Sequence, residues 1–242
     1  MLPLRDTIPS RTTPVVTIAL IVLNALAFLI ELGQGAGLGR FLAEYGLVPV
    51  RYHWVAEQHP LDLVGRFGPV FTSMFLHGGW LHFLGNMLFL WIFGDNVEDR
   101  LGRWTFVAFY AVCGLAAAML QVHLLPRAGV PMIGASGAIA GVLGAYLVLF
   151  PRSRVLTAVP VFFFLHVIEV PAVLFLGVWF LLQFLSAGLE ATRGAADAAG
   201  GVAWWAHVGG FAAGALLGPP LARLHARRKP KTYPTREIFH PW

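Results

Sequence analysis

Four side chains of this 242-residue chain have the types and spacing needed for acyl-transfer chemistry: Ser136, His207, His82 and Asn86. A serine hydroxyl becomes an effective nucleophile when a neighbouring base takes its proton, and histidine suits that role. His82 and Asn86 are four residues apart, so on a helix they share a face and can hold an oxyanion together with the backbone N–H of Ser136. No Asp or Glu stands near these residues in the sequence, which predicts a Ser136–His207 dyad without an acidic third member.

The setting of Ser136 predicts a membrane-spanning helix around it. Residues 128–150 contain no Asp, Glu, Lys or Arg, and about 20 apolar residues cross the hydrocarbon layer of a membrane. A helix that starts near residue 132 would hold Ser136 about four residues, or roughly 6 Å, below its start. Such a serine also fits a purely structural role, bonding to a carbonyl one turn earlier. The chemical interpretation therefore depends on what the other helices carry.

The composition indicates a polytopic helical membrane protein. The chain is 57% hydrophobic and 12% charged, with a mean hydropathy of +0.71, whereas soluble domains contain about 25% charged residues. The net charge of +5 sits in short loops and near the end of the chain rather than on a basic face, so we expect no nucleic-acid partner. Cys113 is the only cysteine, which excludes an intrachain disulfide and a cysteine metal cluster. We expect no metal and no cofactor.

Six apolar stretches predict an all-α bundle of six transmembrane helices. We place them at 14–32, 80–93, 104–125, within 128–150, at 171–188 and at 202–217, with Pro219 and Pro220 closing the last one. The predicted organisation is a cytoplasmic segment at 1–13, a six-helix domain at 14–222 and a basic cytoplasmic tail at 223–242.

The connections are predicted from their polarity and length. Residues 33–67 form a long mixed loop, for which we expect short helices on the membrane surface. Residues 95–103 read as a charged turn and 190–201 as a loop of small residues. The stretch 155–170 is apolar but interrupted by Pro160, and we interpret it as an interfacial or re-entrant lead-in to the fifth helix.

Basic residues predict the side on which the termini lie. With six spans, one side holds both termini and twelve basic residues: Arg5, Arg11, Arg100, Arg103, Arg152, Arg154, Arg223, Arg227, Arg228, Lys229, Lys231 and Arg236. The other side holds five: Arg40, Arg51, Arg66, Arg127 and Arg193. Because positive residues accumulate on the cytoplasmic side, we expect a multi-pass protein of the cell (inner) membrane with both termini cytoplasmic. The second, fourth and sixth helices then begin at the extracytoplasmic face and bring the four chemical residues to one depth.

Glycines spaced by about one turn predict close contact between the fourth and sixth helices. The fourth stretch contains Gly134, Gly137 and Gly141, and the sixth contains Gly210 and Gly214. Small residues at this spacing allow helix backbones to approach each other. Such contact would bring the Ser136 hydroxyl within about 3 Å of the His207 ring.

Three motifs together resemble those of the rhomboid intramembrane serine proteases, over roughly residues 14–220. Gly134-Ala135-Ser136-Gly137 resembles the GxSG element, the segment from His82 to Asn86 resembles HxxxN, and Ala206-His207-Val208-Gly209-Gly210 with Gly214 resembles the final-helix AHxxG…G pattern. The resemblance implies a six-helix bundle that cleaves membrane proteins within or beside their transmembrane helices. It implies Ser136 as nucleophile, His207 as general base, and His82 and Asn86 at the oxyanion. Where many members carry a Trp-Arg pair before the second helix, this chain reads Arg66-Phe67.

The sequence therefore predicts a serine endopeptidase that acts within the lipid bilayer on single-pass or other transmembrane substrates, through an acyl-enzyme near the extracytoplasmic face. Three alternatives stay open. One is an inactive rhomboid-like protein that binds membrane clients. Another is a metal-dependent protein using His77, His82 and His207, although the chain lacks an HExxH pattern and a nearby carboxylate. The third is a transporter, although repeats and paired intramembrane charges are missing from the sequence.

Overall fold

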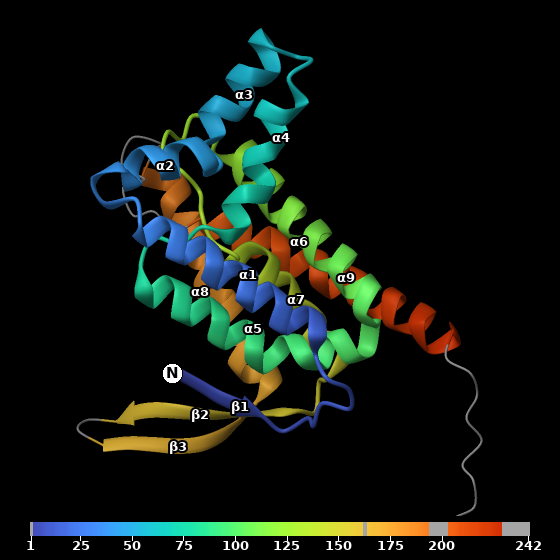
Figure 1. Ribbon diagram of the computed structural model, residues 1–242. Helices are drawn as coiled ribbons and strands as arrows, with labels where there is room; N and C mark the ends of the chain where they lie inside the picture. The colour runs from blue at the N-terminus through green and yellow to red at the C-terminus, as the bar shows by residue number, and fades with distance from the viewer. Residues whose placement is uncertain (1, 162–163, 194–202, 229–242) are drawn as a thin grey trace, which may run out of the picture.

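A computed structural model of the protein describes residues 2–161, 164–193 and 203–228, which form a helical bundle with one small sheet at its end (Figure 1). The longer helices are α1 (Val15–Leu32), α5 (Trp80–Leu101), α6 (Arg103–Leu124), α7 (Ser136–Leu149), α8 (Ala172–Arg193) and α9 (Trp204–Arg228). Between α1 and α5 lie the short helices α2 (Leu38–Tyr45), α3 (Pro49–Gln58) and α4 (Leu63–Thr72), together with the 3-10 turns Gly35–Gly37 and Ser73–Phe75. Short helices in the first loop are what the sequence indicates.

Helix α7 is the centre of the bundle. Its residues 137–146 are all buried, and it contacts α5, α6, α8 and α9 (Figure 1). A helix that is apolar on every side needs neighbours on every side, and residues such as Leu143 and Tyr146 are fully covered. The position of the helix that carries Ser136 is therefore fixed by packing against these four neighbouring helices.

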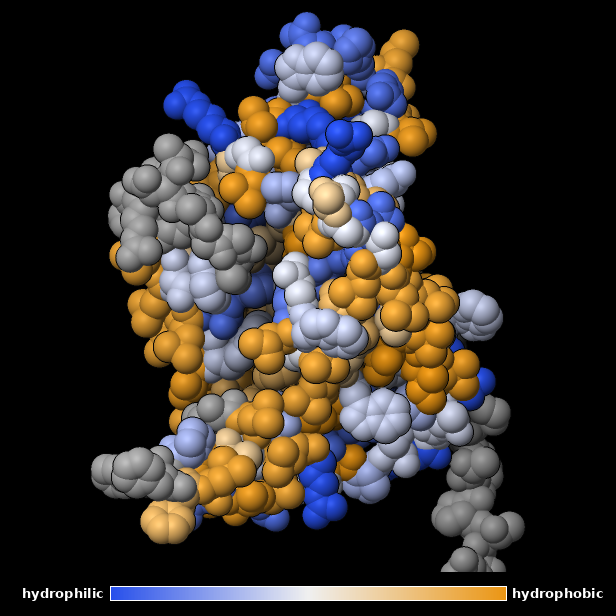
Figure 2. Space-filling model, turned by 60° about the vertical axis from the view of Figure 1, so that its left-hand side comes forward, coloured by the Kyte–Doolittle hydropathy of each residue, from blue (hydrophilic) through white to orange (hydrophobic). Residues whose placement is uncertain are grey.

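In the part of the chain that the structure describes, three helices are long and apolar enough to cross a membrane: Val15–Leu32, Arg103–Leu124 and Ala172–Leu189. Large apolar side chains of α1 and α8 point outward; Leu29, for example, is 61% exposed. Hydrophobic residues also cover much of the middle of the face in Figure 2, while hydrophilic ones gather at the end formed by the short helices. The protein is a helical membrane protein, and the count of six spans stays a prediction.

The predicted charged turn at 95–103 is wrong, because α5 continues to Leu101. An acidic residue in this part of α5 is stabilised by hydrogen-bond donors from the N-terminal part of the chain. The carboxylate of Glu98, 2% exposed, accepts hydrogen bonds from the backbone N–H of Val16 at 3.0 Å and from the N–H and hydroxyl of Thr17 at 2.8 and 2.9 Å. Glu98 thereby caps the first turn of α1, which has no capping side chain of its own.

The predicted end of the sixth helix at Pro219 and Pro220 is wrong. Helix α9 runs through both prolines to Arg228, so residues 223–228 of the predicted tail are helical. A proline removes one backbone hydrogen bond but can be tolerated where neighbouring elements hold the helix. Residues 190–193, predicted as loop, belong to α8. The rest of that predicted loop, the expected start of the sixth span at 202 and the basic residues from 229 onward lie outside the described residues.

The all-α prediction is wrong in one place, where a three-stranded antiparallel sheet replaces the expected lead-in at 155–170. The sheet has the order β1 (Leu2–Asp6), β2 (Arg154–Val161), β3 (Phe164–Pro171), with Leu2 opposite Ala158 and Arg154 opposite Pro171. Valine and isoleucine favour strands. Pro160 lies beyond the part of β2 that pairs with β1, so β2 has only one neighbour there. Strand β1 comes from the distant N-terminus, and a local sequence pattern could not reveal its pairing with β2.

Candidate active site

Ser136 and His207 meet between α7 and α9. The Oγ of Ser136 lies 2.7 Å from Nε2 of His207, and the His207 side chain is buried while Ser136 is half-buried. Ser136 is the first residue of α7 and His207 the fourth of α9. The expected depth of four residues for Ser136 is therefore wrong, because α7 begins later than the apolar run does.

Of the predicted glycines, Gly137, Gly141, Gly210 and Gly214 lie where α7 and α9 touch, whereas Gly134 precedes α7 and faces His82 of α5. A Cβ added to Gly210 would lie 1.9 Å from the carbonyl oxygen of Gly137, and one added to Gly214 would lie 1.8 Å from that of Gly141. Ordinary contact begins at 3.4 Å, so no larger residue fits at either position without moving a backbone. This close approach brings the serine and the histidine within hydrogen-bond distance.

Backbone contacts fix the start of α7. Gly134 has a φ of +124° and donates its N–H to the carbonyl of Ser73 at 2.8 Å. Met132, two residues earlier, pairs with Leu47. Since Ser136 opens the helix, its N–H has no acceptor within the first turn and can serve an external oxygen. The start of α7 thus supplies both a hydroxyl and a backbone donor.

His82, the third residue of α5, faces the same spot. Its Nδ1 accepts the N–H of Gly78 at 3.3 Å, which leaves the proton on Nε2. A Cβ added to Gly134 would lie 2.8 Å from that Nε2 and 3.4 Å from the Oγ of Ser136. The absence of a side chain at Gly134 therefore leaves a small space bordered by both groups.

Asn86 lies one turn further along α5 and is 7% exposed. Within the described residues its Nδ2 is buried without a hydrogen-bond partner. A buried donor without a partner carries a free-energy cost. The Nδ2 of Asn86 is therefore available to donate a hydrogen bond to a bound group. On one helix, His82 and Asn86 present two N–H donors along the same face.

The ring of His207 is held on its far side by groups that the sequence analysis did not select. Its Nδ1 lies 2.7 Å from Oε1 of Gln183, a buried residue of α8. The rings of Trp179 and Trp204 lie 5.9 and 6.1 Å from the imidazole centroid. One signal for Gln183 was available, since it is the only amide side chain in the apolar span 172–189.

His77, considered above as a metal ligand, and Glu169, an acid within the apolar stretch 155–170, make contacts outside the Ser136–His207 pair. His77 donates its backbone N–H to both carboxylate oxygens of Glu31 at 3.0 Å, and its ring lies 5.2 Å from that of His82. Glu169 is exposed and pairs with Arg154 at 3.0 Å. In the part of the chain that the structure describes, no group of three His, Cys, Asp or Glu residues could hold a metal ion.

Comparison with known proteins assigns the family. The profile of the Rhomboid domain matches residues 65–224. The chain is 31% identical to Rhomboid protein 1, mitochondrial, of Saccharomyces cerevisiae, over 74% of this chain and 46% of that protein. It is 31% identical to Rhomboid protease GluP of Bacillus subtilis, over 58% of this chain and 26% of that protein. It is 28% identical to RHOMBOID-like protein 1 of Arabidopsis thaliana, over 91% and 57%.

These alignments cover only about a quarter to just over half of the relatives' lengths. The matched region of this chain nevertheless contains the three motifs, from His82 on α5 through Ser136 on α7 to His207 on α9. On the profile match and these relatives, the chain belongs to the rhomboid family.

Proposed function

We propose that this protein is an intramembrane serine endopeptidase that cleaves transmembrane substrates through an acyl-enzyme. The observation that carries the proposal is the 2.7 Å approach of Ser136 Oγ to His207 Nε2. One relative, that of Bacillus subtilis, is named a protease, which agrees with this chemistry.

The reaction begins with proton transfer from Ser136. As Oγ attacks the carbonyl carbon of the substrate peptide bond, its proton passes to Nε2 of His207. The carbonyl oxygen becomes an oxyanion, which the backbone N–H of Ser136, Nε2–H of His82 and Nδ2–H of Asn86 stabilise. In comparable sites the loss of one such donor costs about 10²–10³ in rate.

Collapse of the tetrahedral intermediate gives the acyl-enzyme. Nε2–H of His207 protonates the leaving amine, the C–N bond breaks and an ester to Ser136 forms. A water then attacks the ester carbonyl while Nε2 of His207 takes its proton. The C–O bond to Ser136 breaks as Nε2–H of His207 returns the proton to Oγ, which releases a carboxylic acid and regenerates the serine hydroxyl. A cavity of about 20 Å³ borders Ser136, Gly134 and Ser73 and has room for about one water.

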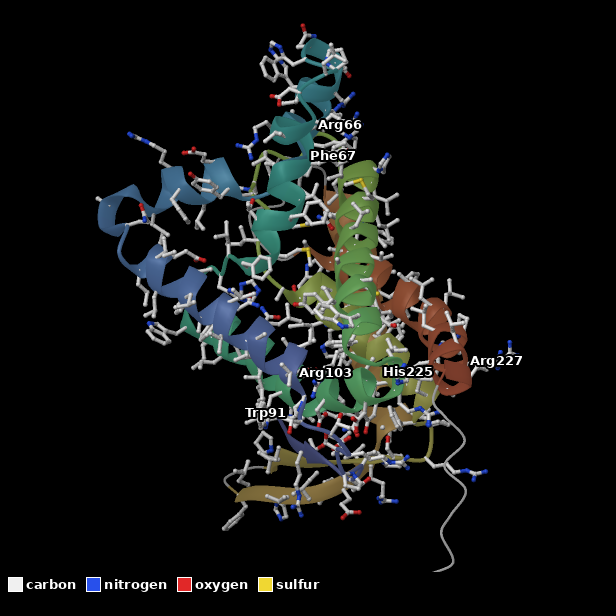
Figure 3. All side chains as sticks on the ribbon, turned by 45° about the vertical axis from the view of Figure 1, so that its right-hand side comes forward. Arg66, Phe67, Trp91, Arg103, His225 and Arg227 are labelled. Atoms are coloured by element: carbon white, nitrogen blue, oxygen red, sulfur yellow. The ribbon has the colours of Figure 1, made fainter. Side chains whose placement is uncertain are left out.

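We also propose that the site faces the extracytoplasmic side with both termini in the cytoplasm. The first turns of α5, α7 and α9 carry the site, and the opposite end of the bundle carries Arg103 and Arg227, as Figure 3 shows. Arg66 and Phe67 lie towards the other end of the bundle, which the short helices form. The excess of basic residues at the sheet end supports this orientation.

Substitution of the dyad tests the proposal. Purified protein in liposomes is incubated with a single-pass substrate that has helix-breaking residues near the extracytoplasmic face, since a peptide bond must leave its helix to be attacked. Ser136→Ala and His207→Ala are each expected to abolish cleavage while the thermal unfolding midpoint stays near wild type. Cleavage by either folded variant would refute the mechanism. A fluorophosphonate probe, expected to label the wild type but not Ser136→Ala, separates an enzyme from an inert client-binding protein.

A further inference from the structure

We propose that Gln183 is a positioning residue that holds His207 in the tautomer able to take the proton of Ser136. This inference rests on the proposed function. The candidate site then consists of a linear chain of three groups from three helices: Ser136 on α7, His207 on α9 and Gln183 on α8. Gln183 makes no contact with the reacting atoms and acts through the imidazole.

The two hydrogen-bond distances at the His207 ring support this role. Both ring nitrogens of His207 have a partner at 2.7 Å, Ser136 Oγ on Nε2 and Gln183 Oε1 on Nδ1. A neutral imidazole carries one proton, so only one nitrogen donates. When Nδ1–H donates to Oε1 of Gln183, the lone pair of Nε2 faces the serine and accepts its hydroxyl proton. The opposite tautomer would place an N–H against Oγ, from which it could not accept a proton.

The same contact stabilises the product of proton transfer. Once Nε2 has taken the serine proton the ring is an imidazolium, whose Nδ1–H still points at a carbonyl-type oxygen. Gln183 and His207 are 9% and 8% exposed, and a buried hydrogen bond to a charged group contributes more than one in water. An amide oxygen thus supplies, without a full charge, the support that a carboxylate gives in a triad.

Among the residues that the structure describes, few other groups could accept a hydrogen bond from Nδ1 of His207. The rings of Trp179 and Trp204 flank the imidazole but offer no acceptor to Nδ1. His82 of α5 borders the same site, but its Nδ1 already accepts the N–H of Gly78. Gln183 is therefore the group placed to choose the tautomer.

Two substitutions test the inference. Gln183→Met keeps the length and shape of the side chain but removes the strong acceptor, so both tautomers become available. We expect kcat to fall roughly 10- to 100-fold with KM within about twofold, and labelling of Ser136 by a fluorophosphonate to slow in parallel. Gln183→Glu presents only acceptors to Nδ1. We expect it to recover most of kcat and to move the acidic limb of the pH profile upward by about one pH unit or more, because a carboxylate favours the imidazolium.

The control is Leu182→Met on the same helix. The side chain of Leu182 is 56% exposed, and this variant is expected to behave as wild type. The inference is overturned if folded Gln183→Met keeps the wild-type kcat, or if Gln183→Glu is no more active than Gln183→Met and has an unshifted pH profile. If Gln183→Met does not purify as folded protein, the profile of Gln183→Glu decides alone. Ser136→Ala in the same assay distinguishes the proposed function from the role of Gln183. Continued cleavage by Ser136→Ala would refute the proposed function. If Ser136→Ala is inactive while Gln183→Met is unaffected, only the role of Gln183 is refuted.

Discussion

Replacing Gly214 by alanine is expected to inactivate the site from two helical turns away. The new Cβ would lie 1.8 Å from the carbonyl oxygen of Gly141, where ordinary contact begins at 3.4 Å. The backbones of α7 and α9 must then separate by about 1.6 Å, the difference between these two distances. Gly141 also lies against Cys113 of α6, so α7 has a second close neighbour at this point.

The dyad cannot absorb such a shift. If about half of it reaches the start of α9, the Oγ–Nε2 distance grows from 2.7 Å to about 3.5 Å, near the outer limit of a hydrogen bond. A misplacement of about 1 Å at a reacting group can cost roughly 10² in rate. Overpacking itself is expected to lower the free energy of unfolding by about 1–3 kcal/mol.

The assay compares initial cleavage rates and thermal unfolding of Gly214→Ala with a matched variant, Gly177→Ala. Gly177 lies in α8 and a Cβ there would meet nothing within 4 Å, so alanine is expected to be neutral or to stabilise by up to about 1 kcal/mol. A Gly214→Ala protein with wild-type rate and unfolding midpoint would refute the close-contact argument. Equal losses in both variants would mean that the effect does not come from the α7–α9 contact.

Three further predictions concern the oxyanion donor, the cap of α1 and a buried acid. Asn86→Ala is expected to lower kcat about 10²-fold with little change in KM, measured on the same substrate, because one oxyanion donor is lost; an unchanged kcat would remove Asn86 from the mechanism. Glu98→Ala leaves the donors of Val16 and Thr17 unpaired and is expected to reduce the free energy of unfolding by about 2–4 kcal/mol in denaturant titrations in detergent; a loss below 1 kcal/mol would contradict that cap. Burial raises the pKa of the Asp6 carboxyl above its ordinary range, so the folded protein binds this proton more tightly than the unfolded chain, and Asp6 adds stability as the pH falls from neutral through the raised pKa towards the unfolded value. Asp6→Asn should flatten that part of the stability–pH curve in thermal unfolding between pH 7 and 4, and an unaltered curve would show that Asp6 is not its source.

The sequence by itself indicated the family and predicted that Ser136 and His207 form a pair, which the structure brings within hydrogen-bond distance. Ser136, His207 and His82 stand out because polar, chemically capable residues are rare in apolar stretches, where each one is costly to place. The spacing of Gly210 and Gly214 likewise predicted a close helix contact, since only small residues let backbones approach. These features are residue types and short spacings, so they can be read from the sequence without knowledge of the fold.

Only the tertiary structure decided the rest, because it depends on contacts between distant segments. The pairing of β1 with β2 joins residue 2 to residue 158, and no local pattern predicts that partner. Ser136 opens α7 because a glycine with positive φ and a hydrogen bond to Ser73 end the preceding turn, although the apolar run begins earlier. Nothing in the sequence shows that Gln183 faces His207 rather than another neighbour, and only packing of α8 against α9 turns its amide oxygen towards the histidine.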